Sequence, residues 1–349
     1  MSKNSTENER PVISCRNVWK VFGANATDFE KEKLDNLNEN TLTAKKWTAA
    51  VCDVSFDIGR GEVFVIMGLS GSGKSTMVRC MSRLIEPTSG DVNIEGENLL
   101  SVSDEKLIEI RRQKMGMVFQ HFALLPNRDV LGNVAFPLQV QGISRKEREV
   151  RASEMISLVG LEGRENFFPA ELSGGQQQRV GIARSLASNP SIWFLDEPFS
   201  ALDPLIRSDL QDELLRLQAQ LNKTIVFITH DLDEAIKIAD RIAIMDQGRI
   251  VQIGTPEDLI MRPANEYVAR FTKGVPKSKV VKVSTIMKPV AGNHPKTSSF
   301  LNINDRVADV ADILTKTQEA IGVRNDGGDI VGVVDRETFI RILAGADIK

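Results

Sequence analysis

Short apolar runs, each ending in a polar or small residue, give this chain its clearest pattern. They occur at 62–67, 115–119, 192–197 and 225–229. Runs this short, rich in Val, Ile and Phe, are typical of strands buried on both faces of a parallel sheet. Stretches with helical spacing separate them, so the pattern predicts an α/β fold in which strands and helices alternate.

Two helical stretches are the most distinct. Residues 146–159 form a charged, amphipathic pattern in which Val150, Ile156 and Val159 are among the apolar positions. In 205–221, the apolar residues that share one helical face are Ile206, Leu210, Leu214, Leu217 and Leu221. We interpret this second stripe as core packing rather than as a binding surface.

The composition changes at 273–279, where Lys, Gly and Pro indicate a linker. Beyond it, 283–287, 307–314, 320–324 and 329–335 are predicted as strand, helix, strand and strand, and 338–343 as a closing helix. We therefore expect a large domain over 1–274, a linker over 275–282 and a small α+β domain over 283–349.

Charge and hydropathy narrow the possible functions. The chain has 349 residues, a net charge of −3 and a pI near 5.8, so nothing in its charge indicates nucleic-acid binding. Its mean hydropathy is −0.16, and no apolar run approaches the roughly 20 residues that span a bilayer. Residues 1–10 lack the apolar core of a secretory signal. The three cysteines are scattered, which favours reduced thiols in the cytosol over a disulfide or a metal site.

The first strong chemical motif follows the 62–67 run. Gly68–Ser75 fits the phosphate-binding pattern G-x-x-x-x-G-K-[ST] at each fixed position, and 76–84 begins a helix. Backbone N–H groups and the helix N-terminus would bind phosphate, while Lys74 reaches the β- and γ-phosphates and the Ser75 hydroxyl binds Mg²⁺. The candidate nucleotide-binding residues here are Gly68, Ser70, Gly71, Ser72, Gly73, Lys74, Ser75 and Thr76.

Two acids end the 192–197 run. A buried strand would deliver Asp196 and Glu197 to the carboxyl edge of the sheet, where open α/β sheets bind ligands. Asp196 fits a carboxylate on the Mg²⁺ side, and Glu197 fits the general base for an attacking water. Two solvated acids at a strand end would be the simplest alternative.

The phosphate loop and the sequence Leu-Ser-Gly-Gly-Gln at 172–176 together resemble the ATP-binding-cassette family, over about 14–274. The resemblance implies a P-loop NTPase fold with a helical subdomain at about 121–178. It also implies a homodimer in which ATP lies between the loop of one copy and the 172–176 segment of the other. The implied residues of that segment are Ser173, Gly174, Gly175 and Gln176.

The same resemblance assigns roles to single residues. Gln120 would contact Mg²⁺ and the water, Asp203 would lie in a loop that crosses the dimer interface, and His230 would contact the γ-phosphate. An aromatic ring near the N-terminus would stack on the adenine. Phe22 is the candidate and Trp47 the rival, because a long polar segment separates their strands and stacking needs only a flat face.

A narrower resemblance is carried by 64–84, by Ser-Ala-Leu-Asp-Pro-Leu-Ile-Arg at 200–207 and by His-Asp-Leu-Asp-Glu-Ala at 230–235. These are similar to the ATPase subunits of glycine betaine and proline betaine importers, whose relatives carry choline, carnitine or trimethylamine N-oxide. The resemblance implies a membrane permease, a periplasmic or lipid-anchored substrate-binding protein, and a location on the cytoplasmic face of the cell membrane.

The segment 283–349 resembles one cystathionine-β-synthase-type (CBS) regulatory repeat. Such a tail would sense ionic strength, bind a nucleotide or only dimerise, and the sequence does not decide among these. Two other functions remain for the whole chain. The single cassette and the net negative charge disfavour a cassette ATPase of translation or DNA repair. Glu197 and His230 disfavour a nucleotide sensor that does not hydrolyse ATP.

Overall fold

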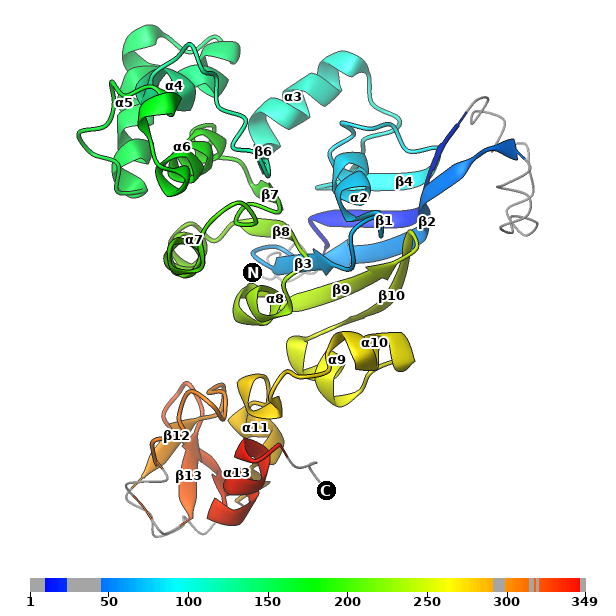
Figure 1. Ribbon diagram of the computed structural model, residues 1–349, viewed down its shortest axis with the longest axis vertical. Helices are drawn as coiled ribbons and strands as arrows, with labels where there is room; N and C mark the ends of the chain where they lie inside the picture. Colours follow the sequence, from blue (N-terminus) through cyan, green and yellow to red (C-terminus); the bar gives the residue numbers. More distant parts are fainter. Residues whose placement is uncertain (1–9, 24–44, 291–298, 314–316, 318–319, 346–349) are drawn as a thin grey trace, which may run out of the picture. The chain divides into compact units, whose positions relative to one another are not determined.

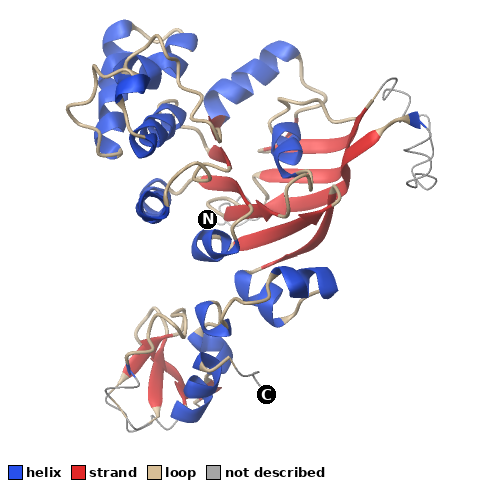
Figure 2. Cartoon of the chain, in the orientation of Figure 1, coloured by secondary structure: helices blue, strands red, loops and turns tan. Residues whose placement is uncertain are grey.

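The computed structural model describes residues 10–23, 45–290, 299–313, 317 and 320–345. These form two compact units, 1–251 and 252–349. Helices and strands are labelled as in Figure 1, and Figure 2 separates them by colour. No helix among the described residues is both long enough and apolar enough to cross a membrane.

A six-stranded sheet forms the centre of the first unit, in the order β10-β9-β3-β8-β7-β6. Its strands are β3 (Val63–Met67), β6 (Met115–Val118), β7 (Ile192–Asp196), β8 (Thr224–Thr229), β9 (Arg241–Asp246) and β10 (Arg249–Gly254). Strands β6, β7, β8, β3 and β9 pair in parallel. The strands predicted from the apolar runs are thus confirmed, and the carboxyl ends of β3, β6, β7 and β8 meet at one edge.

A second, antiparallel sheet has the order β2-β1-β4-β5. It contains β1 (Ile13–Phe22), β2 (Thr48–Ile58), β4 (Ser89–Ile94) and β5 (Glu97–Asn98). Phe56 of this sheet stacks on Phe64 of β3, with ring centroids 5.1 Å apart, so the two sheets share a core. Most of the polar segment between β1 and β2, residues 24–44, lies outside the described residues.

The helices of the first unit fall into two groups. The first comprises α2 (Lys74–Met81), α3 (Asp104–Lys114), α7 (Pro204–Leu221) and α8 (Leu232–Ile238). The second comprises α4 (Val130–Val140), α5 (Arg145–Leu158) and α6 (Gly174–Leu186), which pack on one another as a separate cluster, and the short η3 (Pro169–Glu171) precedes α6. This cluster overlaps the helical segment expected at about 121–178 and extends beyond it, because α6 ends at Leu186.

Both predicted amphipathic helices form. In α7 the side chains of Leu210, Leu214 and Leu217 are buried, as the stripe predicted. In α5 Ile156 is buried, whereas Val150 is 54% exposed, so this apolar position lies outside the buried face of the helix.

The second unit begins with α9 (Pro256–Met261), α10 (Glu266–Phe271), η4 (Lys277–Lys279) and α11 (Val283–Ile286). A small sheet follows, in the order β11-β14-β13-β12, and α13 (Arg336–Leu343) closes the unit. The strands are β11 (Lys288–Pro289), β12 (Phe300–Asn302), β13 (Ile321–Arg324) and β14 (Ile330–Val334). Only β12 and β13 run parallel among these pairs.

Three details of this unit differ from the sequence-based expectation. The strand expected at 283–287 is a helical turn, because Val283 and Ile286 bury their side chains three residues apart. The helix expected at 307–314 has turns over 307–312, residue 313 is helical, and residue 314 lies outside the described residues. The segment 275–282, expected to be a linker, contains η4 and the buried Val280 and Val281.

Candidate nucleotide site

At two positions of the loop between β3 and α2, the backbone has a conformation that only glycine adopts readily. Gly68 and Gly73 have φ values of 156° and 100°. A Cβ at Gly68 would overlap the carbonyl oxygen of Met245, and one at Gly73 would overlap that of Ala50. The loop can therefore lie tightly against its neighbours, with its backbone directed toward the carboxyl edge of the sheet.

Lys74 places a positive charge inside this loop. Its Nζ donates hydrogen bonds to the carbonyl oxygens of Gly68 (2.9 Å) and Leu69 (3.0 Å). Burial lowers the pKa of Lys74, while the carboxylates of Glu197 and Asp196 act in the opposite direction. A partly desolvated ammonium beside open loop backbone is a favourable partner for a phosphate.

Next to Lys74, a hydroxyl and a carboxylate form a pair suited to a hard cation. Ser75 Oγ donates to Asp196 Oδ1 at 2.8 Å, and Arg79 Nη2 lies 3.6 Å from Asp196 Oδ2. No cluster of three or more His, Cys, Asp or Glu is placed to bind a metal in the described parts of the chain. Mg²⁺ at a nucleotide needs only one or two such ligands, since phosphate and water supply the rest, so Ser75 and Asp196 fit it.

Three polar side chains meet at the end of β7. Glu197 Oε2 lies 3.3 Å from His230 Nδ1 and 3.4 Å from Gln120 Nε2. Glu197 has a φ of 46°, and its N–H donates to the carbonyl oxygen of Ile228 at 3.2 Å. The structure thus brings together Gln120, Glu197 and His230, which follow three different strands.

The 172–176 segment and Asp203 take no part in this cluster within one chain. Ser173 caps α6: its Oγ accepts from the Gln176 N–H, and Gln176 Oε1 accepts from the Ser173 N–H at 2.9 Å. Asp203 caps α7 through the N–H groups of Leu205 and Ile206. No hydrogen bond joins either cap to the Gly68–Ser75 loop in the part of the chain that the structure describes.

The structure separates the two aromatic candidates. Phe22, at the end of β1, is 41% exposed, whereas Trp47 is 7% exposed and packs in a cluster with Trp19 and Cys52. An adenine needs an accessible ring face, so the burial favours Phe22. Phe22 also has the Lys20 ammonium 5.0 Å from its ring centroid.

Two residues near the site were missed. Arg79 lies four residues after Ser75 in α2, and this helical spacing could have placed both beside Asp196. Glu234, in the first turn of α8 and four residues after His230, is buried and accepts from Gln211 Nε2 at 3.0 Å, and burial raises its pKa. Its partner comes from another helix, so no local signal could have found this pair.

A groove of about 400 Å³ lies beside the site, where β6, the end of α3, α4 and the end of α6 meet. Its lining is largely apolar and includes Met115, Phe119, Phe136 and Val140, with Arg111 and Arg184 among its charged members. Arg184 also donates to the carbonyl oxygens of Phe122 and Ala123, two and three residues after Gln120. The groove therefore borders the loop that carries Gln120.

Comparison with known proteins agrees with this geometry. The family model described as ABC transporter matches residues 51–200. A trimethylamine N-oxide transport system ATP-binding protein of Pelagibacter ubique is 51% identical, covering 97% of this chain and 99% of that protein. The glycine betaine/proline betaine transport system ATP-binding protein of Escherichia coli is 50% identical, covering 79% and 69%.

One solved structure extends the comparison to the fold. The ATP-binding cassette MJ0796, in a dimeric post-hydrolysis state bound to ADP and Pi, is 35% identical. The match covers 70% of this chain and 98% of that one, with a TM-score of 0.59. The P-loop NTPase fold expected from the sequence is confirmed for the first unit.

Proposed function

This chain belongs to the ABC transporter ATP-binding proteins, which are ATPases, and from that premise we propose that it powers the import of a small methylated amine. The observation that carries the proposal is the end-to-end match to two trimethylamine N-oxide transport proteins, from Pelagibacter ubique and Ruegeria pomeroyi. Glycine betaine transport proteins match almost as closely over a smaller share of their length. We therefore place trimethylamine N-oxide first and glycine betaine second.

In the proposed hydrolysis, Lys74 and the Gly68–Ser75 backbone bind the β- and γ-phosphates. Glu197 accepts the proton of the attacking water, and Gln120 and His230 hold that water and the γ-phosphate in line with it. Ser75, Asp196 and Gln120 would hold Mg²⁺, which neutralises phosphate charge when bound. The arrangement is supported by the short distances around Glu197.

We propose that the apolar groove at α3, β6, α4 and α6 receives a short segment of a separate membrane permease. Its support is its position next to Gln120 and its lining by partly exposed apolar side chains. A permease docked there would hold the chain at the cytoplasmic face of the membrane. A substrate-binding protein would deliver the solute from the other side.

We further propose that two copies of the chain close over ATP, with Ser173, Gly174, Gly175 and Gln176 of one copy facing Lys74 of the other. The support is that Ser173 and Asp203 serve only as helix caps within one chain. The dimeric MJ0796 cassette offers a precedent. For the second unit we keep the CBS-like regulatory role as a proposal, with ionic-strength sensing, nucleotide binding and simple dimerisation as its alternatives.

The test of the transport proposal is reconstitution. The chain, its permease and its substrate-binding protein are placed in liposomes, and ATP-dependent uptake of labelled trimethylamine N-oxide and glycine betaine is measured. We expect uptake of at least one, abolished by Lys74→Ala. ATP hydrolysis without uptake of either solute, or of choline and carnitine, would contradict the proposed substrate class.

A further inference from the structure

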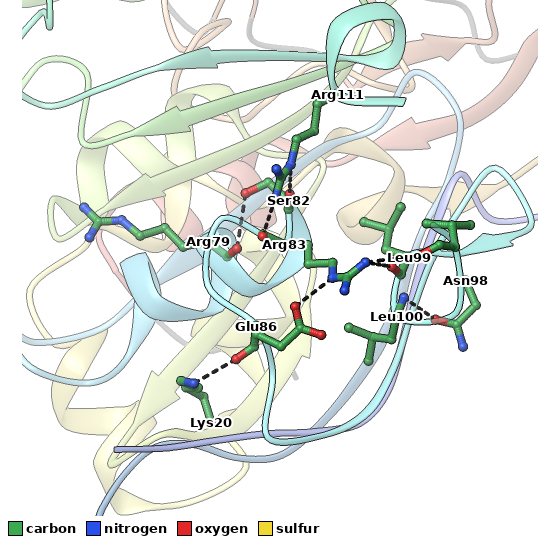
Figure 3. A network of polar contacts seen from close by, with 10 residues as sticks. Lys20, Arg79, Ser82, Arg83, Glu86, Asn98, Leu99, Leu100 and Arg111 are labelled. Atoms are coloured by element: carbon green, nitrogen blue, oxygen red, sulfur yellow. Dashed lines mark hydrogen bonds and ion pairs between the residues drawn. The ribbon is translucent and has the colours of Figure 1, made fainter. Parts of the chain in front are cut away.

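The C-terminal end of α2 is held by a network of side chains, drawn in Figure 3. Helix α2 ends at Met81, and Arg83 follows with a φ of 51°, a left-handed conformation that non-glycine residues rarely adopt. The N–H groups of Ser82, Ile85 and Arg83 bond the last carbonyl groups of α2, those of Val78, Arg79 and Cys80. The carbonyls of Ser82 and Arg83, directly after the helix, take their partner from α3.

Arg111, in the last turn of α3, supplies that partner. Its Nε donates to the Ser82 carbonyl oxygen at 3.0 Å, and its Nη2 donates to the Arg83 carbonyl oxygen. One planar guanidinium therefore ties two successive carbonyls, and its positive charge lies at the negative end of the α2 dipole. Burial lowers the pKa of Arg111, which indicates partial removal from water, where such charge-assisted bonds are strong.

Neighbouring bonds make this end of α2 rigid. Arg83 Nε donates to Glu86 Oε2 at 2.7 Å, and Arg83 Nη1 donates to the Leu99 carbonyl oxygen at 2.8 Å. Lys20 Nζ donates to the Glu86 carbonyl oxygen at 2.8 Å, so β1 joins the network. A displacement of Arg111 would consequently move a well-ordered unit rather than a loose chain end.

The same Arg111 also lines the groove described above, next to Met115 and Phe136. At the other end of α2 lie Lys74 and Ser75, about 12 Å away at 1.5 Å per residue. A helix of this length moves as one body, since packed elements shift rather than deform. Arg111 thus contacts both the groove and the far end of the helix that carries the phosphate-binding residues.

We propose that Arg111 is a positioning residue that transmits occupancy of the groove to the phosphate-binding helix α2. This inference rests on the proposed function, because it takes a permease segment as the occupant. A segment seated in the groove shifts the guanidinium, the guanidinium shifts the Ser82 and Arg83 carbonyls, and α2 moves Lys74 and Ser75 into the geometry for hydrolysis.

The experiment compares Arg111→Gln, Arg111→Lys and the matched control Arg112→Gln in the full chain. Arg112 lines the same groove, but in the described part of the chain its guanidinium bonds neither the Ser82 nor the Arg83 carbonyl. ATPase rates are measured for each chain alone and after reconstitution with the permease, and assembly is checked by gel filtration. The readout is the ATPase rate after reconstitution divided by the rate of the chain alone, together with the KM for ATP.

We expect Arg111→Gln to assemble with the permease, to lower the ratio by about tenfold and to raise the KM of the isolated chain by about threefold. Arg111→Lys keeps the charge without the two-donor fork, so an intermediate ratio is expected, and it carries the test if Arg111→Gln does not fold. Arg112→Gln should keep the parent ratio.

Different failures overturn different statements. A parent chain that no permease stimulates would overturn the proposed function and this inference with it. Stimulation of the parent with an unchanged ratio in Arg111→Gln would overturn the inference alone. So would an equal loss of ratio in Arg112→Gln, or a full parent ratio in Arg111→Lys, because either result would assign the effect to groove charge rather than to the two carbonyl bonds.

Discussion

Glu197 combines a strained backbone with three polar contacts. Its φ of 46° costs about 1 kcal/mol for a residue with a Cβ. Backbone strain of this kind persists only where the surroundings hold it, and here the Ile228 carbonyl, His230 and Gln120 do so. The carboxylate lies close enough to Lys74 to oppose the lowering of the Lys74 pKa by burial, so it lies beside the phosphate-binding loop.

We predict that Glu197→Gln retains ATP binding and loses hydrolysis by about 10²–10⁴-fold, because an amide cannot accept the proton while the Lys74 contacts remain. Single-turnover hydrolysis and ATP binding would be measured side by side. Ser200→Ala is a suitable control, since its hydroxyl bonds the Glu197 carbonyl rather than the carboxylate. A Glu197→Gln chain that keeps more than a tenth of the parent rate would contradict the assignment.

The two aromatic candidates yield opposite predictions. Phe22→Ala should raise the KM for ATP with little change in thermal stability, because its ring is exposed. Trp47→Ala should instead lower stability by about 3 kcal/mol, since it removes a large buried side chain. ATP titrations and melting curves of both variants would test this, with GTP as a control for base contacts. A Trp47→Ala chain of normal stability with weak ATP binding would reverse the assignment.

At the scale of single residues, the sequence indicated which motif residues meet at one edge of the sheet. It missed hydrogen bonds between side chains and backbone groups that lie far apart in the chain. Lys74, Glu197 and His230 each follow a strand, and parallel strands bring such positions to one edge. Arg111 bonds residues 28 and 29 positions earlier in the chain, so neither periodicity nor a motif could indicate its partner.

Among the elements, α13 shows how a helix start stabilises the second unit. Asp335 Oδ1 accepts from the Thr338 N–H at 2.7 Å, and Lys288 Nζ lies 3.0 Å from Asp335 Oδ2. The Thr338 N–H is the largest cause that lowers the pKa of Asp335 from 3.8 to about 2, with Lys288 adding to it. The carboxylate form is therefore the one that the folded unit prefers.

This preference gives a pH-dependent prediction. A group with a lowered folded-state pKa stabilises the fold above its ordinary pKa and loses that contribution as pH falls through the folded value. Asp335→Asn keeps an acceptor for the cap but has no charge. The difference in α13 amide-exchange protection between the parent and Asp335→Asn should be constant above pH 5 and fall between pH 4 and about 2.

Asp335→Ala removes the cap itself and should cost about 1 kcal/mol at pH 7. Equal exchange rates in the parent and both variants at each pH would show that the cap does not stabilise α13. Among elements, the short apolar strands of the first unit and the amphipathic helices were predictable, whereas α11 was not. Its single turn is fixed by the burial of Val283 and Ile286, which depends on the completed unit.

At the scale of the whole molecule, the sequence-based division at 274 differs from the compact units, which meet between 251 and 252. Helices α9 and α10 lie beyond that boundary, although the resemblance to cassettes was expected to reach about 274. Sequence similarity follows descent, whereas a compact unit follows packing, so the two limits need not coincide. The expected domain limits stay a prediction.

The proposed closure of two copies over ATP gives the last prediction. Ser173 has its hydroxyl directed at its own helix start, on α6, while Lys74 lies on α2 of the same unit without a bond to it. If Ser173 acts on ATP held by a partner's Lys74, Lys74→Ala and Ser173→Arg chains should each be inactive alone. Mixed dimers then contain one site that carries both changes and one that carries neither.

Mixing the two variants should therefore restore part of the ATPase activity, in proportion to the mixed dimers. Differently tagged chains allow those dimers to be isolated and assayed, and a chain with both changes is the control, because mixing it with itself cannot create an intact site. An active Ser173→Arg homodimer would remove Ser173 from the site. An inactive, verified mixed dimer would show either that Ser173 acts within its own chain or that one intact site cannot turn over. A mixed dimer of Lys74→Ala with the parent separates these, because activity there proves that a single intact site suffices.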